Sequence, residues 1–423
     1  MVQSLRSWIV VGISFVNIAV AFGLNFSFSV FLVAISEEFN WSRASVAGAF
    51  SLSSLILGIG SWPTGGLADR FGPRKMLMAG SIILSFATIA SGWIEEVWHL
   101  YLVVGIFGAI GICNLGWVPH SVLISNWFVE RRGTMVGIAF SGMGIGILAI
   151  GPAAQYLISS FGWRTAYKFL GLLVLVLLLP LNYFVRDRPN GEQSESKWIY
   201  LGQKGGGSVQ NKEFNRERDE TIDWTLGRSM MTLPFWSIFF SFFLIPIGIF
   251  PVVIHQVAYM IDHGYSKMLA ASVFGAVGLL SGSGRLFFGT LSDQMGRVKA
   301  VTISFIFSIV GIIILLLLPS LKTVFWLYFY AVLFGIGFGA RGPIITAMLA
   351  DMYKGKNFGS IYGFINVGNG VGGALGPWLG GYLYDLTGSY RLSFLICIPI
   401  LVLACILFWM AVRLYTNTKD EKL

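Results

Sequence analysis

The sequence has few charged residues and few cysteines. Asp, Glu, Lys and Arg make up 12% of its 423 residues, whereas an ordinary soluble protein has about 25%. The 3 cysteines, Cys113, Cys397 and Cys405, all lie within apolar runs, so they indicate packing and neither disulfides nor a metal site. The sequence also contains no phosphate-binding loop and no nucleophile motif. These absences argue against a soluble enzyme, a disulfide scaffold and a protein that depends on a cofactor.

Long apolar runs dominate the chain, and 55% of its residues are hydrophobic. A bilayer core about 30 Å thick needs about 20 apolar residues per helix. The first run is too long for a signal peptide, so we expect it to remain as helix 1. We therefore predict an all-α polytopic membrane protein. Its twelve transmembrane helices are expected at 8–35, 44–68, 76–94, 98–127, 134–158, 164–185, 234–261, 267–290, 300–318, 322–350, 358–384 and 392–414.

The positions of Lys and Arg predict the orientation. With the N-terminus inside, 21 of the 29 basic residues fall on the inner side, 6 fall on the outer side, and Arg285 and Arg341 lie within helices. Because basic residues accumulate in cytoplasmic loops, both termini are predicted to be cytoplasmic. The net charge of +9 then faces the anionic inner leaflet, so we do not interpret it as a surface for nucleic acid.

A polar segment divides the chain into two halves. Residues 186–232 include Gly205-Gly206-Gly207-Ser208 and are expected to form a flexible cytoplasmic linker. Residues 1–185 then form an N-terminal six-helix bundle, and residues 233–423 form a C-terminal one. The stretch from Trp224 to Trp236 is predicted to be an interfacial helix that leads into helix 7.

The two halves repeat each other. Gly65–Gly72 recurs 224 residues later as Gly289–Gly296, and we expect each copy in the short loop after the second helix of its half. Trp117-Val118-Pro119 aligns with Arg341-Gly342-Pro343 at the same offset. Tyr156 and Gly162 align with Tyr382 and Gly388 at an offset of 226. A duplicated six-helix unit is a transporter architecture, with the substrate bound between the halves near the midplane.

These motifs resemble those of a known family. Gly65–Lys75 and Gly289–Lys299 resemble the loop motif of the major facilitator superfamily, and Trp127–Ala139 is similar to the helix-5 signature of the monocarboxylate transporter family, which includes bacterial oxalate/formate exchangers. Arg285–Gly289 resembles that family's helix-8 arginine segment. The resemblance implies the major facilitator fold, two pseudo-symmetric bundles around a central cavity, in a bacterial cytoplasmic (inner) membrane. Ser281 stands where some proton-coupled members carry Asp, and helix 11 has no Lys where oxalate exchangers use one.

Two arginines lie deep within predicted helices. Arg285 and Arg341 each cost about 2.5–3.5 kcal/mol near the bilayer centre, so such residues face a cavity and meet an anion or a carbonyl. All 20 Asp and Glu residues fall in loops or at helix ends, which leaves no acid as an internal partner. We therefore predict that Arg285 binds a substrate carboxylate. Arg341, nearer the cytoplasm, is either a second anion site or part of a gate.

Two histidines also lie within the predicted membrane region. His120 and His255 could carry a proton, although a lone histidine is more often neutral and bonded to a backbone carbonyl. Pro246 and Pro251 predict a broken helix before His255. For this reason His255 is the better candidate for proton coupling.

Several polar and aromatic side chains are candidates for lining the substrate cavity. Asn25 and Ser29 are one turn apart in helix 1, and Asn366 and Asn369 share one face of helix 11. The alternative for these side chains is hydrogen bonding between helices. Trp117 and Tyr259 complete the predicted substrate-binding set.

Charged residues at the cytoplasmic helix ends are candidates for a gate. The carboxylate of Asp69 could contact the positive N-terminus of a neighbouring helix. The alternative is plain topogenic charge, but topology depends on Lys and Arg rather than Asp. The predicted gating set is Asp69, Arg70, Arg74, Asp293 and Arg297.

Together these features predict a secondary transporter of a small organic anion and not an enzyme. Proton-coupled symport of a monocarboxylate by alternating access is the preferred interpretation. Obligate exchange of a dicarboxylate for a monocarboxylate, efflux of an amphipathic compound, and a transporter-like sensor are the alternatives. The expected partners are the anion, protons and the lipid bilayer, with no nucleic acid and no cofactor, and we expect a monomeric functional unit.

Overall fold

The computed structural model describes residues 5–128, 132–187, 224–321, 323–353 and 358–420. Within these ranges all regular structure is helical. The N-terminal half contains α1 (Leu5–Phe39), α2 (Arg43–Phe71), α3 (Pro73–Ala90) with a short 3-10 turn at Ser91–Trp93, α4 (Val97–Leu100), a π-helix at Tyr101–Gly108, α5 (Ala109–Leu115), α6 (Trp117–Trp127), α7 (Arg132–Phe161) and α8 (Trp163–Phe184). The C-terminal half contains α10 (Leu226–Met230), α11 (Leu233–Asp262), α12 (Lys267–Met295), α13 (Arg297–Leu321), α14 (Val324–Met352), α15 (Phe358–Thr387) and α16 (Arg391–Asp420).

Each of the twelve predicted spans corresponds to a helix or a chain of helices. In the described residues, eleven spans are long and apolar enough to cross a membrane. The twelfth, α15, is outside that group because its many glycines and its two asparagines lower its hydropathy. The predicted 186–232 linker lies mostly outside the described residues, and the expected interfacial helix is reduced to the single turn and a half of α10.

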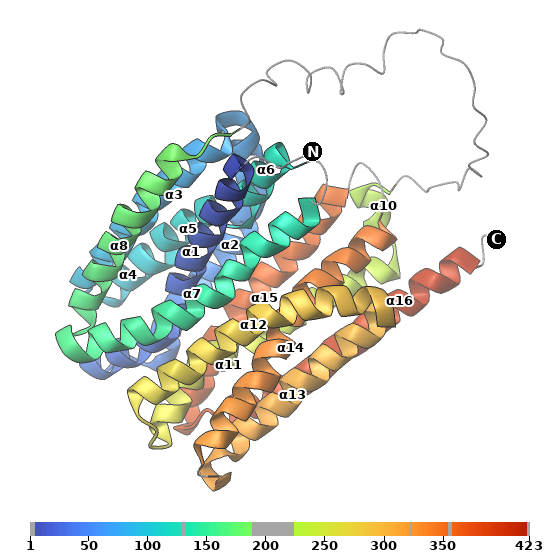
Figure 1. Cartoon of the computed structure of the whole chain (residues 1–423). Helices are drawn as coiled ribbons and strands as arrows, with labels where there is room; N and C mark the ends of the chain where they lie inside the picture. The colour runs from blue at the N-terminus through green and yellow to red at the C-terminus, as the bar shows by residue number, and fades with distance from the viewer. Residues whose placement is uncertain (1–4, 129–131, 188–223, 322, 354–357, 421–423) are drawn as a thin grey trace.

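The two halves stand side by side as two helical bundles (Figure 1). The start of α1, the end of α8, α10 and the end of α16 all lie on one side, which we call the terminal side. The other side, where α1 ends and α12 begins, is called the opposite side. The sequence predicts that the terminal side is cytoplasmic.

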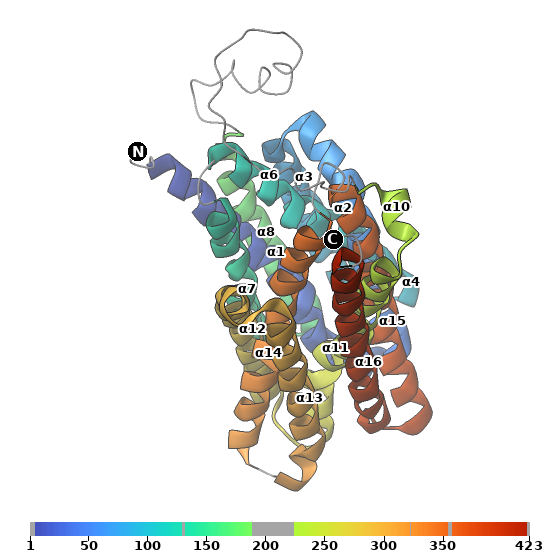
Figure 2. The same ribbon diagram turned by 90° about the vertical axis from the view of Figure 1, so that its right-hand side faces the viewer.

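Two seams of small residues join the halves, α2 against α15 and α7 against α12; Figure 2 also shows α7 beside α12. Gly58 of α2 meets Gly370 of α15 backbone to backbone. A Cβ added at Gly144 of α7 would lie 2.7 Å from the carbonyl oxygen of Gly278 in α12. Lipid provides no hydrophobic force between helices, so close backbone packing of this kind is what holds them together.

Three local features differ from the sequence prediction. The Gly65–Gly72 motif is not a loop: α2 continues to Phe71, and only Gly72 turns, with φ of 83°. Its repeat behaves in the same way, and Gly296 has φ of 87°. Positive φ favours glycine because it has no Cβ, so the feature that the two copies share is a helix end followed by a glycine turn.

The prediction of a broken helix before His255 is also wrong, because α11 runs unbroken through Pro246 and Pro251. Proline removes the hydrogen bond to the carbonyl four residues earlier. The carbonyl oxygen of Ile247, which loses its helical partner to Pro251, lies 4.0 Å from the sulfur of Cys397 in α16, whose thiol has a nearer acceptor in the carbonyl of Ser393 at 3.2 Å. Proline is tolerated in membrane helices because neighbouring helices and local adjustments offset the lost bond.

Predicted helix 4 is instead the one that breaks. The chain from Val97 to Trp127 passes from α4 through a π-helix to α5, and then interrupts at Gly116, with φ of −91° and ψ of −155°. Hydropathy alone predicts one continuous span here. The interruption makes Trp117 the first residue of α6.

Candidate functional site

Arg285 lies in α12 and reaches across to the other half. Its Nη2 is 3.6 Å from the sulfur of Met143 in α7, and its guanidinium carbon is 5.9 Å from the centre of the Trp117 ring in α6. Its Nη1 is buried and has no hydrogen-bond partner. A thioether is a weak acceptor, and a guanidinium has five N–H donors. Arg285 therefore holds a positive charge between the halves with most of its hydrogen-bonding capacity unused.

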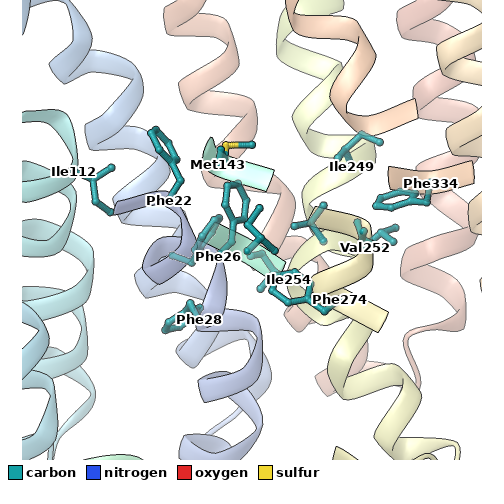
Figure 3. Packing of buried hydrophobic residues seen from close by; sticks show 14 of the residues in the cluster. Phe22, Phe26, Phe28, Ile112, Met143, Ile249, Val252, Ile254, Phe274 and Phe334 are labelled. Carbon is teal, nitrogen blue, oxygen red and sulfur yellow. The ribbon is translucent and has the colours of Figure 1, made fainter. Parts of the chain in front are cut away.

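Further aromatic rings pack around Trp117 and in the layer between the halves. The Trp117 ring packs against Phe22 of α1, at 4.7 Å between ring centres, and against Phe140 of α7, at 4.5 Å. Phe26 of α1 meets Phe338 of α14 at 6.3 Å. Figure 3 shows Phe22 and Phe26 among the buried side chains that fill this layer, together with side chains from α11 and α14. The site thus combines one cation with apolar walls from both halves.

The break in helix 4 brings a helix N-terminus to the same place. Trp117, whose ring lies beneath the Arg285 guanidinium, is the first residue of α6. The N-cap residue Gly116 provides no side-chain hydrogen bond to this terminus. The N-terminus of a helix carries partial positive charge, and discontinuous helices of transporters direct such termini at anionic substrate groups. Both features favour a negatively charged ligand.

The side chain of Arg341 is directed toward α13, in its own half. It is 3% exposed, its Nη2 donates to the hydroxyl of Ser308 at 3.0 Å, and its guanidinium carbon lies 5.0 Å from the Phe305 ring centre. Both partners belong to α13, in its own half. Its Nη1 is buried without a partner. The two deep arginines are therefore directed differently: Arg285 faces the other half, and Arg341 faces α13.

The two candidate histidines are both fully buried. Nε2 of His255 lies 2.9 Å from the carbonyl oxygen of Pro377, and Nδ1 lies 3.2 Å from the hydroxyl of Tyr390. A neutral ring that donates to the carbonyl and accepts from the hydroxyl satisfies this arrangement. His120 has Nδ1 at 3.0 Å from the hydroxyl of Ser14, and its Nε2 is buried without a partner.

The residues predicted to form the polar lining have different environments in the structure. The hydroxyl of Ser29 donates to the carbonyl of Ile254 at 2.8 Å and so ties α1 to α11 across the halves. Asn366 and Asn369 are partly exposed and lie 3.4 Å from each other, which leaves a polar stripe on α15, and Asn25 is also partly exposed.

Tyr259 packs inside the C-terminal half. It is 2% exposed, and its ring contacts His263 and Phe394 at 4.2 and 5.2 Å between ring centres. The structure does not bring it to the Arg285 cluster.

The structure describes the side chains of some of the predicted gating residues and not of others. The side chains of Asp69 and Asp293 lie outside the described residues, although both backbones belong to helices rather than to loops. The Arg70 guanidinium lies over the Phe71 ring at 5.3 Å.

Arg74 and Arg297 both lie at the starts of helices, Arg74 as the second residue of α3 and Arg297 as the first residue of α13. The Arg74 guanidinium lies 5.2 Å from the Tyr183 ring centre, and its backbone N–H donates to Asp187 at 2.7 Å. Arg297 pairs with Asp351 at 2.9 Å. Arg74 thus contacts the end of α8 and Arg297 the end of α14, each within its own half. Asp187 and Asp351 were not among the predicted residues.

The sequence prediction also missed the apolar part of the site. Met143, Phe22 and Phe140 lie around Arg285 and Trp117, but aliphatic and aromatic residues are abundant throughout the chain. A composition-based analysis has no signal that separates those facing a site from those facing lipid.

Comparisons with known proteins show which family and fold the chain resembles. A family model described as Major Facilitator Superfamily matches residues 13–343 and 284–422. Monocarboxylate transporter 2 of Homo sapiens is 25% identical over 402 residues, which cover 94% of this chain and 84% of that protein. Monocarboxylate transporter 13 of Rattus norvegicus is 27% identical, with coverages of 92% and 85%. The uncharacterized MFS-type transporter YcxA of Bacillus subtilis is 27% identical, with coverages of 95% and 94%.

A solved structure shares the fold. It is the crystal structure of a bacterial homolog to the human lysosomal transporter Spinster, in an inward-facing and unoccupied conformation. The TM-score is 0.72 at 17% sequence identity, and the match covers 98% of both chains.

Proposed function

The chain belongs to the Major Facilitator Superfamily, and from this premise we propose that it is a secondary transporter of a small organic anion, with a monocarboxylate as substrate. The two halves would alternately expose the site around Arg285 to the two sides of the membrane. The relatives named monocarboxylate transporters support this choice of substrate class.

The observation that carries the proposal is the unpaired guanidinium of Arg285 between the halves. A guanidinium can hold a carboxylate through two parallel hydrogen bonds. The walls around it are aromatic and apolar, so they suit the hydrocarbon part of the substrate. One cation in an apolar setting matches one carboxylate, which favours a monocarboxylate over a dicarboxylate.

We also propose that the anion travels with a proton. Moving one negative charge against a negative-inside potential costs about 2.3 kcal/mol per 100 mV, and a co-transported proton removes this cost. The proton can reside on the substrate carboxyl group itself, on His120 or on His255. Between the two histidines the geometry favours His120, because one of its ring nitrogens has no partner, whereas both ring nitrogens of His255 are engaged.

A specific observation keeps anion exchange as a second candidate function. Arg341 is another buried arginine with an unpaired Nη1, and a protein with two such charges can carry a dicarboxylate in one direction and a monocarboxylate in the other. Exchange needs no proton, because charge is balanced by the returning anion.

Counterflow in liposomes tests the proposal. Purified protein is reconstituted into liposomes that are preloaded with one unlabelled carboxylate, and uptake of labelled monocarboxylates and dicarboxylates is measured, with the Arg285→Ala protein as control. We expect saturable counterflow of monocarboxylates that the control lacks. A preference for dicarboxylates would favour the exchanger, and absence of counterflow with every carboxylate would refute the proposed substrate class.

A further inference from the structure

A cluster of charged residues joins the two halves at the opposite side. We call it the opposite-side cluster, and it consists of Glu37, Arg43, Asp262, Lys267 and Asp385. Each residue lies at or beside a helix end: α1, α2, α11, α12 and α15, respectively. Two of them come from the N-terminal half and three from the C-terminal half. The cluster lies apart from the Arg285 site and from the predicted gating residues of the terminal side.

Two ion pairs of the cluster cross between the halves. The Lys267 ammonium lies 2.6 Å from a carboxylate oxygen of Glu37. The Arg43 guanidinium lies 3.9 Å from a carboxylate oxygen of Asp262 and 5.5 Å from the ring centre of Tyr384. The Glu37–Lys267 pair is exposed, and such pairs contribute only about 0–1 kcal/mol. The Arg43–Asp262 pair is more buried but long, so neither pair is the main contact between the halves on this side.

The contact made by Asp385 is of a different kind. One of its carboxylate oxygens accepts the backbone N–H of Arg43 at 2.8 Å, and the other accepts that of Ala44 at 2.9 Å. These are the first two N–H groups of α2, which have no partner within their own helix. A carboxylate from one half thus caps a helix of the other half. Such bonds are charge-assisted, and the helix dipole strengthens them.

The backbone around Asp385 is shaped for this contact. Gly381, one turn earlier on α15, lies against the start of α2, and a Cβ added there would stand 2.6 Å from the backbone nitrogen of Ala44. Absence of a side chain at this position lets α15 approach closely enough for the carboxylate to reach both N–H groups. The hydroxyl of Ser42 separately accepts the N–H of Ser45, so Asp385 supplies bonds that the local cap does not.

A neighbouring acid provides the contrast. Glu38 follows Glu37 directly, but its carboxylate bonds to the side chains of Trp163 and Arg164 in α8, within the N-terminal half. When the halves separate on the opposite side, the bonds of Glu38 stay intact. Those of Asp385, and the Glu37–Lys267 and Arg43–Asp262 pairs, have to break.

We infer that Asp385 and the N-terminus of α2 form a latch that holds the opposite side closed and sets how often it opens. The inference rests on the alternating-access part of the proposed function and is independent of which anion is carried. The two ion pairs assist the latch, and the small-residue seam between α2 and α15 places it. Weakening the latch shifts the population toward the state that is open on the opposite side, since a ligand or contact changes an equilibrium only by its difference between the two states.

Spin-label distances test the latch directly. Labels are attached to cysteines at Ser160, at the end of α7, and Leu386, at the end of α15, in full-length protein whose three native cysteines are replaced by serine. Both sites are exposed, and they belong to different halves. The measured quantity is the fraction of molecules with the longer distance, without any substrate.

Asp385→Asn keeps the side-chain volume and removes the charge, and we expect it to raise the ratio of open to closed molecules roughly tenfold, the equivalent of about 1.4 kcal/mol. Glu38→Gln, the matched control, should leave the distance distribution unchanged. Equal distributions for Asp385→Asn and the parent protein would overturn the latch, and so would an equal shift in Glu38→Gln, because it would show a general loosening of this side.

A second variant covers the case in which Asp385→Asn does not fold. Gly381→Ala keeps Asp385 but places a Cβ 2.6 Å from the backbone nitrogen of Ala44, so it should push α15 away from the start of α2 and increase the open fraction. An unchanged distance distribution in Gly381→Ala would overturn the latch. Because the distances need no substrate, a protein that shows the latch but no carboxylate counterflow would refute the proposed substrate and leave the latch intact.

Discussion

Replacement of Arg285 is the most direct perturbation of the proposed site. Its Nη1 has no partner, and its Nη2 has only the sulfur of Met143, so a bound carboxylate would supply bonds that are otherwise unmade. A hydrogen bond to a charged group contributes about 1.5–3 kcal/mol. Loss of two such bonds in Arg285→Ala should therefore cost about 3 kcal/mol or more, which weakens binding by at least about 100-fold. Arg285→Lys keeps the charge and loses the fork, so about a tenfold loss is expected.

The same geometry predicts an opposite effect on stability. A charge inside the membrane region costs about 2.5–3.5 kcal/mol, and here no protein acceptor other than a thioether offsets it. Arg285→Met should therefore raise the unfolding temperature of the substrate-free protein while abolishing binding. Substrate at 100 times its Kd should stabilise the parent protein by about 2.7 kcal/mol and should not shift Arg285→Met.

Equilibrium binding of a labelled carboxylate and thermal unfolding with and without it measure both effects in the same samples. Normal affinity in Arg285→Ala would refute the central assignment. A lower unfolding temperature in Arg285→Met, together with retained binding, would show that Arg285 is a structural residue whose charge is compensated by its surroundings.

Three further outcomes are expected. Asp69→Asn should slow turnover more than it weakens equilibrium binding, because Asp69 is in the last turn of α2, far from a midplane site; equal effects on both would argue against gating. Arg341→Lys should change substrate affinity less than about threefold, since its contacts lie in α13 and additive effects of distant sites are small; a loss comparable to Arg285→Lys would make it a second anion site. An imposed inward proton gradient should drive uptake into empty liposomes with alkalinisation outside, whereas uptake that requires preloaded anion under every gradient would refute symport.

The sequence predicted the number and placement of the helices because hydropathy reports directly on lipid exposure. Even α15, whose glycines and asparagines lower its hydropathy, was predicted as an apolar run at 358–384, because its many glycines are only weakly polar and its one charged residue, Asp385, lies at its end. The interruption at Gly116 was missed because this span was assigned from its overall hydropathy, although Gly116 and Pro119, three residues apart, are a local signal of a helix break. The break expected from Pro246 and Pro251 was wrong because acceptors and donors on other helices compensate for lost bonds, and these are known only from tertiary structure.

The sequence identified the charged residue of the candidate site, but it did not identify the apolar residues around it or the direction in which each arginine side chain is turned. Arg285 stands out in the sequence because an isolated charge in an apolar run is rare. Arg341 stands out equally, and only the structure shows that it turns toward Ser308 rather than the other half. The capping of α2 by Asp385 could not be read from the sequence either, because 341 residues separate Asp385 from Ala44 and nothing in either segment specifies the other.

The glycine seams have a mechanical consequence. Where Gly58 meets Gly370, and where Gly144 meets Gly278 and Gly282, the two halves touch backbone to backbone, without interlocking side chains. Rotation of the halves about such a line does not require side chains at these positions to leave one packing arrangement and enter another. Little repacking is therefore needed at the glycine contacts. Leucine side chains that interdigitate at the same positions would have to repack in every transport cycle. In the proposed alternating access these glycine contacts would serve as the pivot, and contacts at the ends of the halves, such as that of Asp385 with α2, would set the barrier.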